Sequence, residues 1–242
     1  MKNFTSSHNL DKQIGGIYAL LSYVSWGLIP IYWKLLYTSS ALEILAHRML
    51  WSMVFVFGLL AVQKRLNEIL ELLKSSKNIW LLVFTALLLG CNWFVYIYAV
   101  NTDQVIEASL GYYINPLLNV LMGFIFLRER LNFMQCIALG LATLGVLNFL
   151  WDFGSLPWIA LTLSFTFSIY GLLRKVIPVK PLVGLLIETV LFAPLAIIMI
   201  SFWMIDGSGS FGKQWETDFL LIGAGVVTSL PLLWFVNAAK ML

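Results

Sequence analysis

Long apolar segments alternate with short polar connections along almost the whole chain. Each apolar segment is about 20 residues long, which is the length that a helix needs to cross a bilayer. Backbone groups in hydrocarbon must find partners within their own segment, so each segment is predicted to be an α-helix. The eight segments cover 14–35, 41–62, 79–100, 104–127, 133–151, 157–176, 182–205 and 219–241. The pattern therefore predicts an all-α, polytopic membrane helix bundle with about eight transmembrane helices.

The composition agrees with this pattern and removes the soluble alternatives. Hydrophobic residues make up 60% of the chain and charged residues 11%. A typical soluble domain carries roughly 25% charged residues. Turn-forming residues mark the connections at 38–40, 101–103 and 207–210. The chain is thus expected to lie in a membrane.

The basic residues predict the orientation of the helices. With the N-terminus placed inside, twelve Lys and Arg residues fall in inside segments and two in outside segments. The two outside residues are Lys34 and Lys213, and Arg48 lies within a helix. Basic residues concentrate in cytoplasmic loops of membrane proteins. We therefore predict that both termini are cytoplasmic.

A weak internal repeat accompanies the helices. A shift of 140 or 141 residues places Lys34 on Lys175, and Arg48 on Glu188. Five helices separate the two copies, and an odd number inverts the second copy in the membrane. Inverted repeats are typical of secondary transporters, whose substrate site lies between the repeats. The alternative is that two apolar helices align passably by composition alone.

Several polar side chains fall inside the predicted helices, at depths where a charge is costly and usually faces a bundle interior. In the outer half, Arg48 and Glu107 accompany an amide and aromatic rings. One interpretation is a cavity that attracts an anionic or zwitterionic group. The other is that Arg48 reaches outward, or pairs structurally with Glu107 or Glu43. The outer layer comprises His47, Arg48, Asn92, Trp93, Tyr96 and Glu107.

Glu188 is predicted to lie closer to the inner face. A carboxylate at that depth is expensive unless it is hydrated or protonated. The functional interpretation is a proton-coupling group or a contact to a substrate amine. The alternative is a purely structural carboxylate, and both interpretations stay open at this stage.

Three prolines lie near the middle of their predicted helices. Pro116, Pro194 and Pro231 each free a backbone carbonyl and bend the helix. Freed carbonyls at that depth must face protein or water. With the amide of Asn115 they outline a central cavity, although packing kinks would look the same.

The fifth helix, by contrast, carries only a face of small residues. This face is formed by Ala138, Ala142 and Gly145 and indicates close packing or a dimer contact.

Together these residues form the candidate substrate cavity. Its members are Tyr23, Trp26, His47, Arg48, Asn92, Trp93, Tyr96, Glu107, Tyr112, Asn115, Tyr170 and Asn237, with Glu188 as the proton-coupling candidate. The chain shows no phosphate-binding loop, no metal-spaced His/Cys cluster and no catalytic triad context. We therefore expect no enzymatic activity, no cofactor and no metal. The absence of a basic stripe with interleaved aromatic residues argues against nucleic acid.

The ordered motifs resemble the drug/metabolite transporter superfamily, its EamA-type proteins and, among them, the RarD family. The most specific stretch is 107–117, Glu-Ala-Ser-Leu-Gly-Tyr-Tyr-Ile-Asn-Pro-Leu. Further matching residues lie before and after it along nearly the whole chain. They include Trp26-Gly27, His47-Arg48, Asn92-Trp93, Glu129-Arg130-Leu131, Tyr170-Gly171, Arg174-Lys175, Glu188-Thr189, Pro231-Leu232 and Asn237-Ala238.

The resemblance implies a ten-helix permease in a bacterial inner membrane, built from two EamA-type repeats. The first repeat would be 1–151 and the second, incomplete, 157–242, so that the ninth and tenth helices are expected to be missing. The implied function is a secondary-active permease that exports a small metabolite or drug-like solute. The alternatives are a non-transporting membrane partner subunit and a truncated, inactive form. Expected partners are the lipid bilayer, a small-molecule substrate and a second copy in a homodimer.

Overall fold

The computed structural model describes residues 2–153 and 156–242. All the regular secondary structure in these residues is helical. The described part holds nine helices and no strand, which confirms the predicted all-α class. In chain order they are α1 (Lys2–Leu35), α2 (Ala41–Val62), α3 (Asn67–Leu73), α4 (Ser76–Asn101), α5 (Val105–Phe126), α6 (Phe133–Phe153), α7 (Trp158–Val176), α8 (Pro181–Asp206) and α9 (Trp215–Met241).

Seven of these helices are long and apolar enough to cross a membrane. They coincide with seven of the eight predicted segments, and α2 has the predicted bounds, Ala41–Val62. The remaining segment, 133–151, forms α6. Its fully described apolar stretch, Phe133–Phe149, is shorter than the seven spans. The sequence did not predict α3, a helix of 7 residues. The polytopic helical architecture is thus confirmed.

Helix ends follow the predicted turn residues. Ser40 caps α2 by accepting a hydrogen bond from the Glu43 backbone N–H at 3.1 Å. Gly207 ends α8 with φ of 74°, a left-handed conformation that glycine adopts without strain. Pro181 occupies the first turn of α8, where a missing N–H costs no helical hydrogen bond. Short side-chain and glycine signals therefore explain where these helices begin and end.

The three central prolines do not interrupt their helices. Pro116, Pro194 and Pro231 all lie inside continuous α-helices, α5, α8 and α9. Each helix therefore continues past the hydrogen bond that its proline removes, and the predicted bends and freed carbonyls stay predictions.

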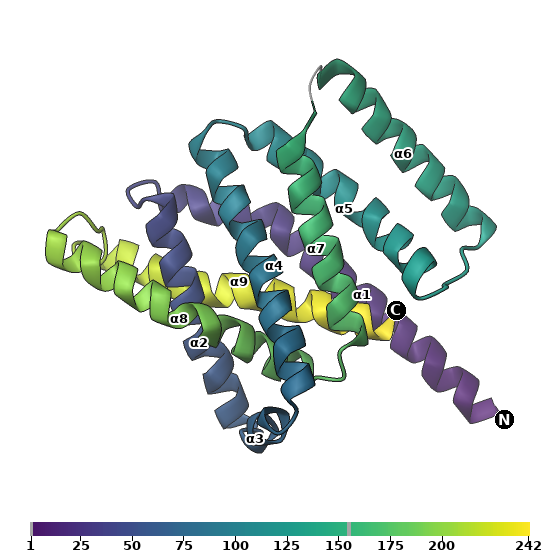
Figure 1. The fold of residues 1–242 in the computed structure, drawn as a ribbon, viewed down its shortest axis with the longest axis horizontal. Helices are drawn as coiled ribbons and strands as arrows, with labels where there is room; N and C mark the ends of the chain where they lie inside the picture. Colours follow the sequence, from purple (N-terminus) through teal and green to yellow (C-terminus); the bar gives the residue numbers. More distant parts are fainter. Residues whose placement is uncertain (1, 154–155) are drawn as a thin grey trace. The chain divides into compact units, whose positions relative to one another are not determined.

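The chain forms two compact units, the first comprising residues up to Ala86 and from Arg174 onward. In this unit α9 lies side by side with α1, and α2 packs against both α8 and α9 (Figure 1). Gly225 permits the contact between α2 and α9, because a Cβ there would lie 2.3 Å from the Trp51 carbonyl carbon. Small residues of this kind let membrane helices approach closely.

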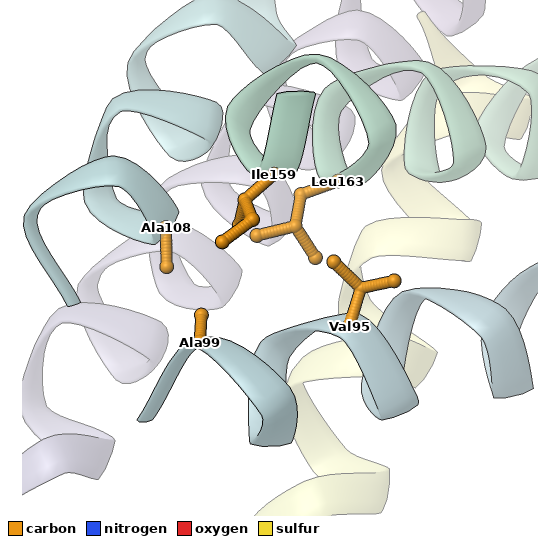
Figure 2. Packing of buried hydrophobic residues seen from close by; sticks show 5 residues of the cluster. All are labelled: Val95, Ala99, Ala108, Ile159 and Leu163. Atoms are coloured by element: carbon orange, nitrogen blue, oxygen red, sulfur yellow. The ribbon is translucent and has the colours of Figure 1, made fainter. Parts of the chain in front are cut away.

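The second unit comprises Leu87–Leu173, so α4 and α7 contribute to both units. Its core joins α4, α5 and α7 through five buried residues (Figure 2): Val95, Ala99, Ala108, Ile159 and Leu163. Gly111 brings α5 close to α7, where an added Cβ would lie 3.0 Å from the Ala160 carbonyl oxygen. This unit is therefore held by small and branched apolar side chains.

The small-residue face of α6 is open in this structure. Ala138, Ala142 and Gly145 are all exposed, and an added Cβ at Gly145 would meet nothing within 4 Å. The predicted packing or dimer contact through this face remains a prediction.

Candidate substrate and ion-coupling site

The most deeply buried charges of the first unit are Glu188 and Arg174. Glu188 lies on α8 and is 1% exposed, and Arg174 lies near the end of α7 and is 0% exposed. The guanidinium Nε lies 3.7 Å from the Glu188 Oε1. The same carboxylate oxygen accepts a 2.6 Å hydrogen bond from the Thr85 hydroxyl of α4. Three helices thus meet at one carboxylate.

Arg174 has few hydrogen-bond partners for a side chain that is fully buried. Its Nη2 donates to the Pro181 carbonyl oxygen at 3.0 Å. Its Nε and Nη1 have no hydrogen-bond partner among the described residues. Gly184 of α8 makes room for the guanidinium, because a Cβ there would lie 2.0 Å from Nη1. The charge pair is therefore an ion pair without a direct hydrogen bond.

A second cation reaches the same turn between α7 and α8. Lys240 of α9 donates from Nζ to the carbonyl oxygens of Ile177, at 3.1 Å, and of Val179. Arg174 and Lys240 are close enough for their charges to interact. The cluster around this turn thus contains two cations and one carboxylate.

Arg48 makes a separate polar contact elsewhere in the first unit. Its Nε donates to the Thr228 hydroxyl of α9 at 3.0 Å. Its guanidinium carbon lies 5.0 Å from the centroid of the Trp33 ring of α1, a cation–π distance. Arg48 therefore bridges α1, α2 and α9.

Glu43 and His47 fasten the connection between α8 and α9 to the start of α2. The Glu43 carboxylate accepts three hydrogen bonds, from the Ser210 N–H at 2.7 Å, the Ser210 hydroxyl at 2.9 Å and the Phe211 N–H at 3.1 Å. The His47 ring stacks on Phe211 with 4.7 Å between centroids. His47 Nδ1 accepts from the Trp51 indole at 3.1 Å. These two side chains therefore have a structural role here, because they hold the connection between α8 and α9 against the start of α2.

The second unit contains a neutral polar seam. Asn92 of α4 donates to the Leu163 carbonyl oxygen at 2.8 Å and to the Thr166 hydroxyl at 2.9 Å, both on α7. Asn115 of α5 donates to the Ser168 hydroxyl at 3.3 Å. Asn119 donates to the Asn115 amide oxygen at 2.9 Å. Amides from two helices therefore converge on α7.

Glu107 belongs to this second unit and has a structural partner. Its Oε1 accepts from the Ile159 backbone N–H at 2.8 Å. A carboxylate at a helix N-terminus satisfies free N–H groups and opposes the helix dipole. Glu107 thus caps α7. The predicted outer layer is split, since His47 and Arg48 belong to the first unit and Asn92, Trp93, Tyr96 and Glu107 to the second.

The remaining predicted site residues differ in exposure. Tyr170 and Trp93 are buried, whereas Tyr112 is 52% exposed and Tyr23 39%. Tyr96 and Tyr112 form an edge-to-face pair at 6.1 Å, and so do Tyr23 and Trp26 at 5.6 Å. Asn237 donates to the Leu233 carbonyl oxygen of its own helix at 2.7 Å. The aromatic set is therefore distributed over both units.

A cavity of about 500 Å³ lies between α5 and α6 in the second unit. Its lining is apolar apart from Arg130 and Cys136. No predicted site residue lines it. No group of three or more His, Cys, Asp or Glu side chains suited to a metal occurs among the described residues.

Arg174, Thr85 and Lys240 could not be recognised as members of a site from the sequence alone. Arg174 was predicted only as an inside charge and as part of a motif that resembles the family, Lys240 was one of the inside charges, and Thr85 is one hydroxyl in an apolar helix. A usable signal was an arginine within the last turn of an apolar span, followed by a glycine and a glutamate in the next span. Gly184 and Glu188 meet that description.

Comparison with known proteins gives one family match and several relatives. A family model described as the EamA-like transporter family matches residues 13–151. Protein RarD of Salmonella typhi is 48% identical over 230 residues, covering 94% of this chain and 78% of that protein. An uncharacterized transporter of Vibrio cholerae is 44% identical over 241 residues, covering 99% of this chain and 80% of that protein.

A more distant relative carries a more specific name. The chloramphenicol-sensitive protein RarD of Pseudomonas aeruginosa is 30% identical over 233 residues, covering 94% of this chain and 77% of that protein. No solved structure matches this chain.

Proposed function

This chain belongs to the EamA-like transporter family, and we propose that it is a secondary-active permease of a bacterial inner membrane. We propose further that it exports a small metabolite or drug-like solute, coupled to protons through Glu188. The family and the named relatives support transport over enzymatic catalysis. All the relatives compared above are bacterial proteins.

The buried charge pair is the observation that carries this proposal. Arg174 and Glu188 both lie in helices that can span a membrane, and both are withdrawn from solvent. Replacing a buried ion pair by apolar residues of similar shape is often neutral or stabilising, so a pair that is kept points to a role other than stability. Ionisable groups at membrane depth mark transport pathways and proton relays. Proton coupling requires a carboxylate that can leave its cationic partner when it binds a proton, and can pair with it again when the proton is released.

Corresponding contacts support the predicted inverted repeat. Arg48 on α2 contacts Trp33 of the helix before it and Thr228 of α9. Glu188 on α8 contacts Arg174 of the helix before it and Thr85 of α4. At a shift of roughly 140 residues, α2 corresponds to α8 and α4 to α9. Each of the two residues therefore connects its own repeat to the third membrane-spanning helix of the other repeat. This helix is α9 for Arg48 and α4 for Glu188.

We also propose that both termini face the cytoplasm. Single cysteines introduced at Ser75 and Ser208 report the two sides, after Cys91 and Cys136, both exposed, have been replaced. An impermeant reagent added outside intact cells should label position 208 and leave position 75 unlabelled. The reverse pattern would refute this topology.

The coupling proposal is tested by flux in proteoliposomes with an imposed pH gradient. A panel of metabolites and antibiotics, chloramphenicol included, is screened for gradient-driven transport. Glu188→Gln should abolish the dependence on the pH gradient while the protein stays folded. Glu71→Gln is the matched control, because it makes the same change at an exposed position on α3. Gradient-driven flux that is unchanged in Glu188→Gln would exclude this residue as the coupling group.

A further inference from the structure

The cluster around Arg174 has the composition of an anion site that is occupied by an internal carboxylate. Arg174 and Lys240 supply two positive charges at the turn between α7 and α8, and Glu188 supplies one negative charge. Lys240 is half-buried, and this set holds no second carboxylate to balance its charge. A ligand with negative charge would restore neutrality.

The pairing geometry shows how such a ligand could enter. A direct charge-assisted hydrogen bond between a guanidinium and a carboxylate is about 2.7–2.9 Å long and is often bidentate. The Arg174–Glu188 separation is 3.7 Å. The Nε and Nη1 groups have no hydrogen-bond partner among the described residues, and they lie on different edges of the guanidinium, so each can donate separately to a ligand oxygen. Arg174 therefore has two N–H donors that its present contacts do not use.

Gly184 lets the guanidinium pack directly against α8. A Cβ at that position would overlap the guanidinium, so Nη1 lies where any other residue would place its side chain. Thr85 holds Glu188 from the opposite side through its short hydrogen bond to Oε1. A neutral, protonated Glu188 could keep this Thr85 contact while it leaves Arg174.

We infer that Arg174 binds the carboxylate of the transported solute, and that Glu188 occupies its place in the solute-free state. This inference rests on the proposed transport function and names its substrate class. On binding, the solute carboxylate pairs with Arg174, and Glu188 leaves it and takes up one proton from the medium. No covalent bond of the solute changes. Charge balances, because one anion and one proton bind together. The two are co-transported, so export proceeds when the outward gradient of the solute exceeds the inward gradient of protons.

Few other ionisable groups can contribute to the pH dependence of this exchange. The only other ionisable side chain on α8 is Asp206, at the end of the helix. The stretch 49–62 of α2 carries no ionisable side chain. Within 219–241, α9 supplies only Lys240, and α7 supplies Lys175 and Tyr170 besides Arg174. The part of α4 in the first unit carries Lys77. Glu188 is thus the carboxylate of the cluster and its proton acceptor.

The test measures binding by thermal stabilisation of the purified, lipid-reconstituted chain. The probes are benzoate, lactate, glutamate and citrate, each compared with its amide. At least one carboxylate should stabilise the wild type, and its amide should not. One proton should be taken up per carboxylate bound, measured with an indicator dye in weak buffer. The apparent Kd should fall up to about tenfold for each unit of pH decrease, as linkage to one proton requires.

Three variants separate the roles of the two charges. Glu188→Gln should bind the same carboxylate about tenfold more tightly, because the competing internal state is gone. It should also lose the proton uptake and the pH dependence. Arg174→Gln with Glu188→Gln, which removes both members of the buried charge pair together, should lose carboxylate binding. Lys175→Gln is the matched control for net charge and should bind as the wild type does.

Two results would overturn the carboxylate assignment. One is that no probe carboxylate binds to Glu188→Gln. The other is that binding survives in the double variant. The outcome is distinguishable from failure of the proposed function. Carboxylate binding without gradient-driven flux would remove the transport proposal alone. Gradient-driven flux of a neutral or cationic solute, without carboxylate binding, would remove this inference alone.

Discussion

The two units of this chain solve the same problem, polar contact between apolar helices, with different chemistry. The first unit uses charges, with Glu188 against Arg174 and Arg48 against Thr228 and the Trp33 ring. The second unit uses mainly neutral amides and hydroxyls, with Asn92 and Asn115 against α7, beside the one carboxylate, Glu107, that caps α7. Neutral hydrogen bonds keep their character at any pH, whereas a carboxylate changes its charge. The comparison indicates a switchable first unit and a fixed second unit.

The largest predicted effect comes from removing one partner of the buried charge pair. Arg174→Met leaves Glu188 buried without its cation and should destabilise the protein by about 3–5 kcal/mol. Combining it with Glu188→Met should recover most of that loss, because an apolar pair needs no compensation. Thermal unfolding of both variants in the same lipid decides the matter. If the single variant is as stable as the wild type, the pair does not carry opposite buried charges.

Close helix approach should matter more in the first unit than in the second. Gly225→Ala places a Cβ 2.3 Å from backbone of α2 and should cost about 1–3 kcal/mol or more. Gly111→Ala meets its neighbour only at 3.0 Å and should cost less. Gly58→Ala, with nothing within 4 Å of the new Cβ, is the control. Equal melting temperatures of all three would contradict the described contact between α2 and α9.

The neutral seam should be a modest stabiliser with no part in coupling. Asn92→Ala removes two hydrogen bonds to α7 and should cost about 1 kcal/mol, since such bonds average well below 2 kcal/mol in membrane proteins. The dependence of flux on pH should stay as in the wild type. A variant that keeps its stability but loses this pH dependence would move the switch into the second unit.

The smallest effect is expected at Glu68, a surface carboxylate of α3 whose two ion pairs include one to Lys180, just before α8. Arg65 and Lys180 donate to the Glu68 carboxylate at 2.9 and 2.6 Å. Their hydrogen bonds and charges lower the pKa of Glu68 from 4.5 to about 2. The resulting stability is present above the unfolded pKa and is lost as the pH falls from 4.5 toward about 2.

Because this pair is partly exposed, Glu68→Gln should cost less than about 1 kcal/mol at neutral pH. Melting curves of the wild type and this variant should converge as the pH falls through that window. Curves that stay parallel at every pH would show that the ion pair is not formed.

Apolar length and turn residues were enough to predict most of this fold. The bounds of α2 follow from a capping serine and a segment of 22 mostly apolar residues, and Gly207 marks the end of α8. Glu188 was also predicted as a buried carboxylate, because its depth depends only on its position within one helix. Its partners could not be predicted, since Thr85 and Arg174 are brought to it by packing among three helices. Glu107 shows the same limit, as its role in capping α7 depends on a contact between helices.

The central claim is that Glu188 changes its protonation state while the rest of the polar framework does not. Infrared difference spectroscopy of the lipid-reconstituted protein on acidification measures this directly, through the carbonyl stretch of a protonated carboxylic acid. We predict a band that is absent from Glu188→Gln and retained in Glu107→Gln, where another buried carboxylate only caps α7. A band that persists unchanged in Glu188→Gln would show that this carboxylate stays ionised, and would contradict the account.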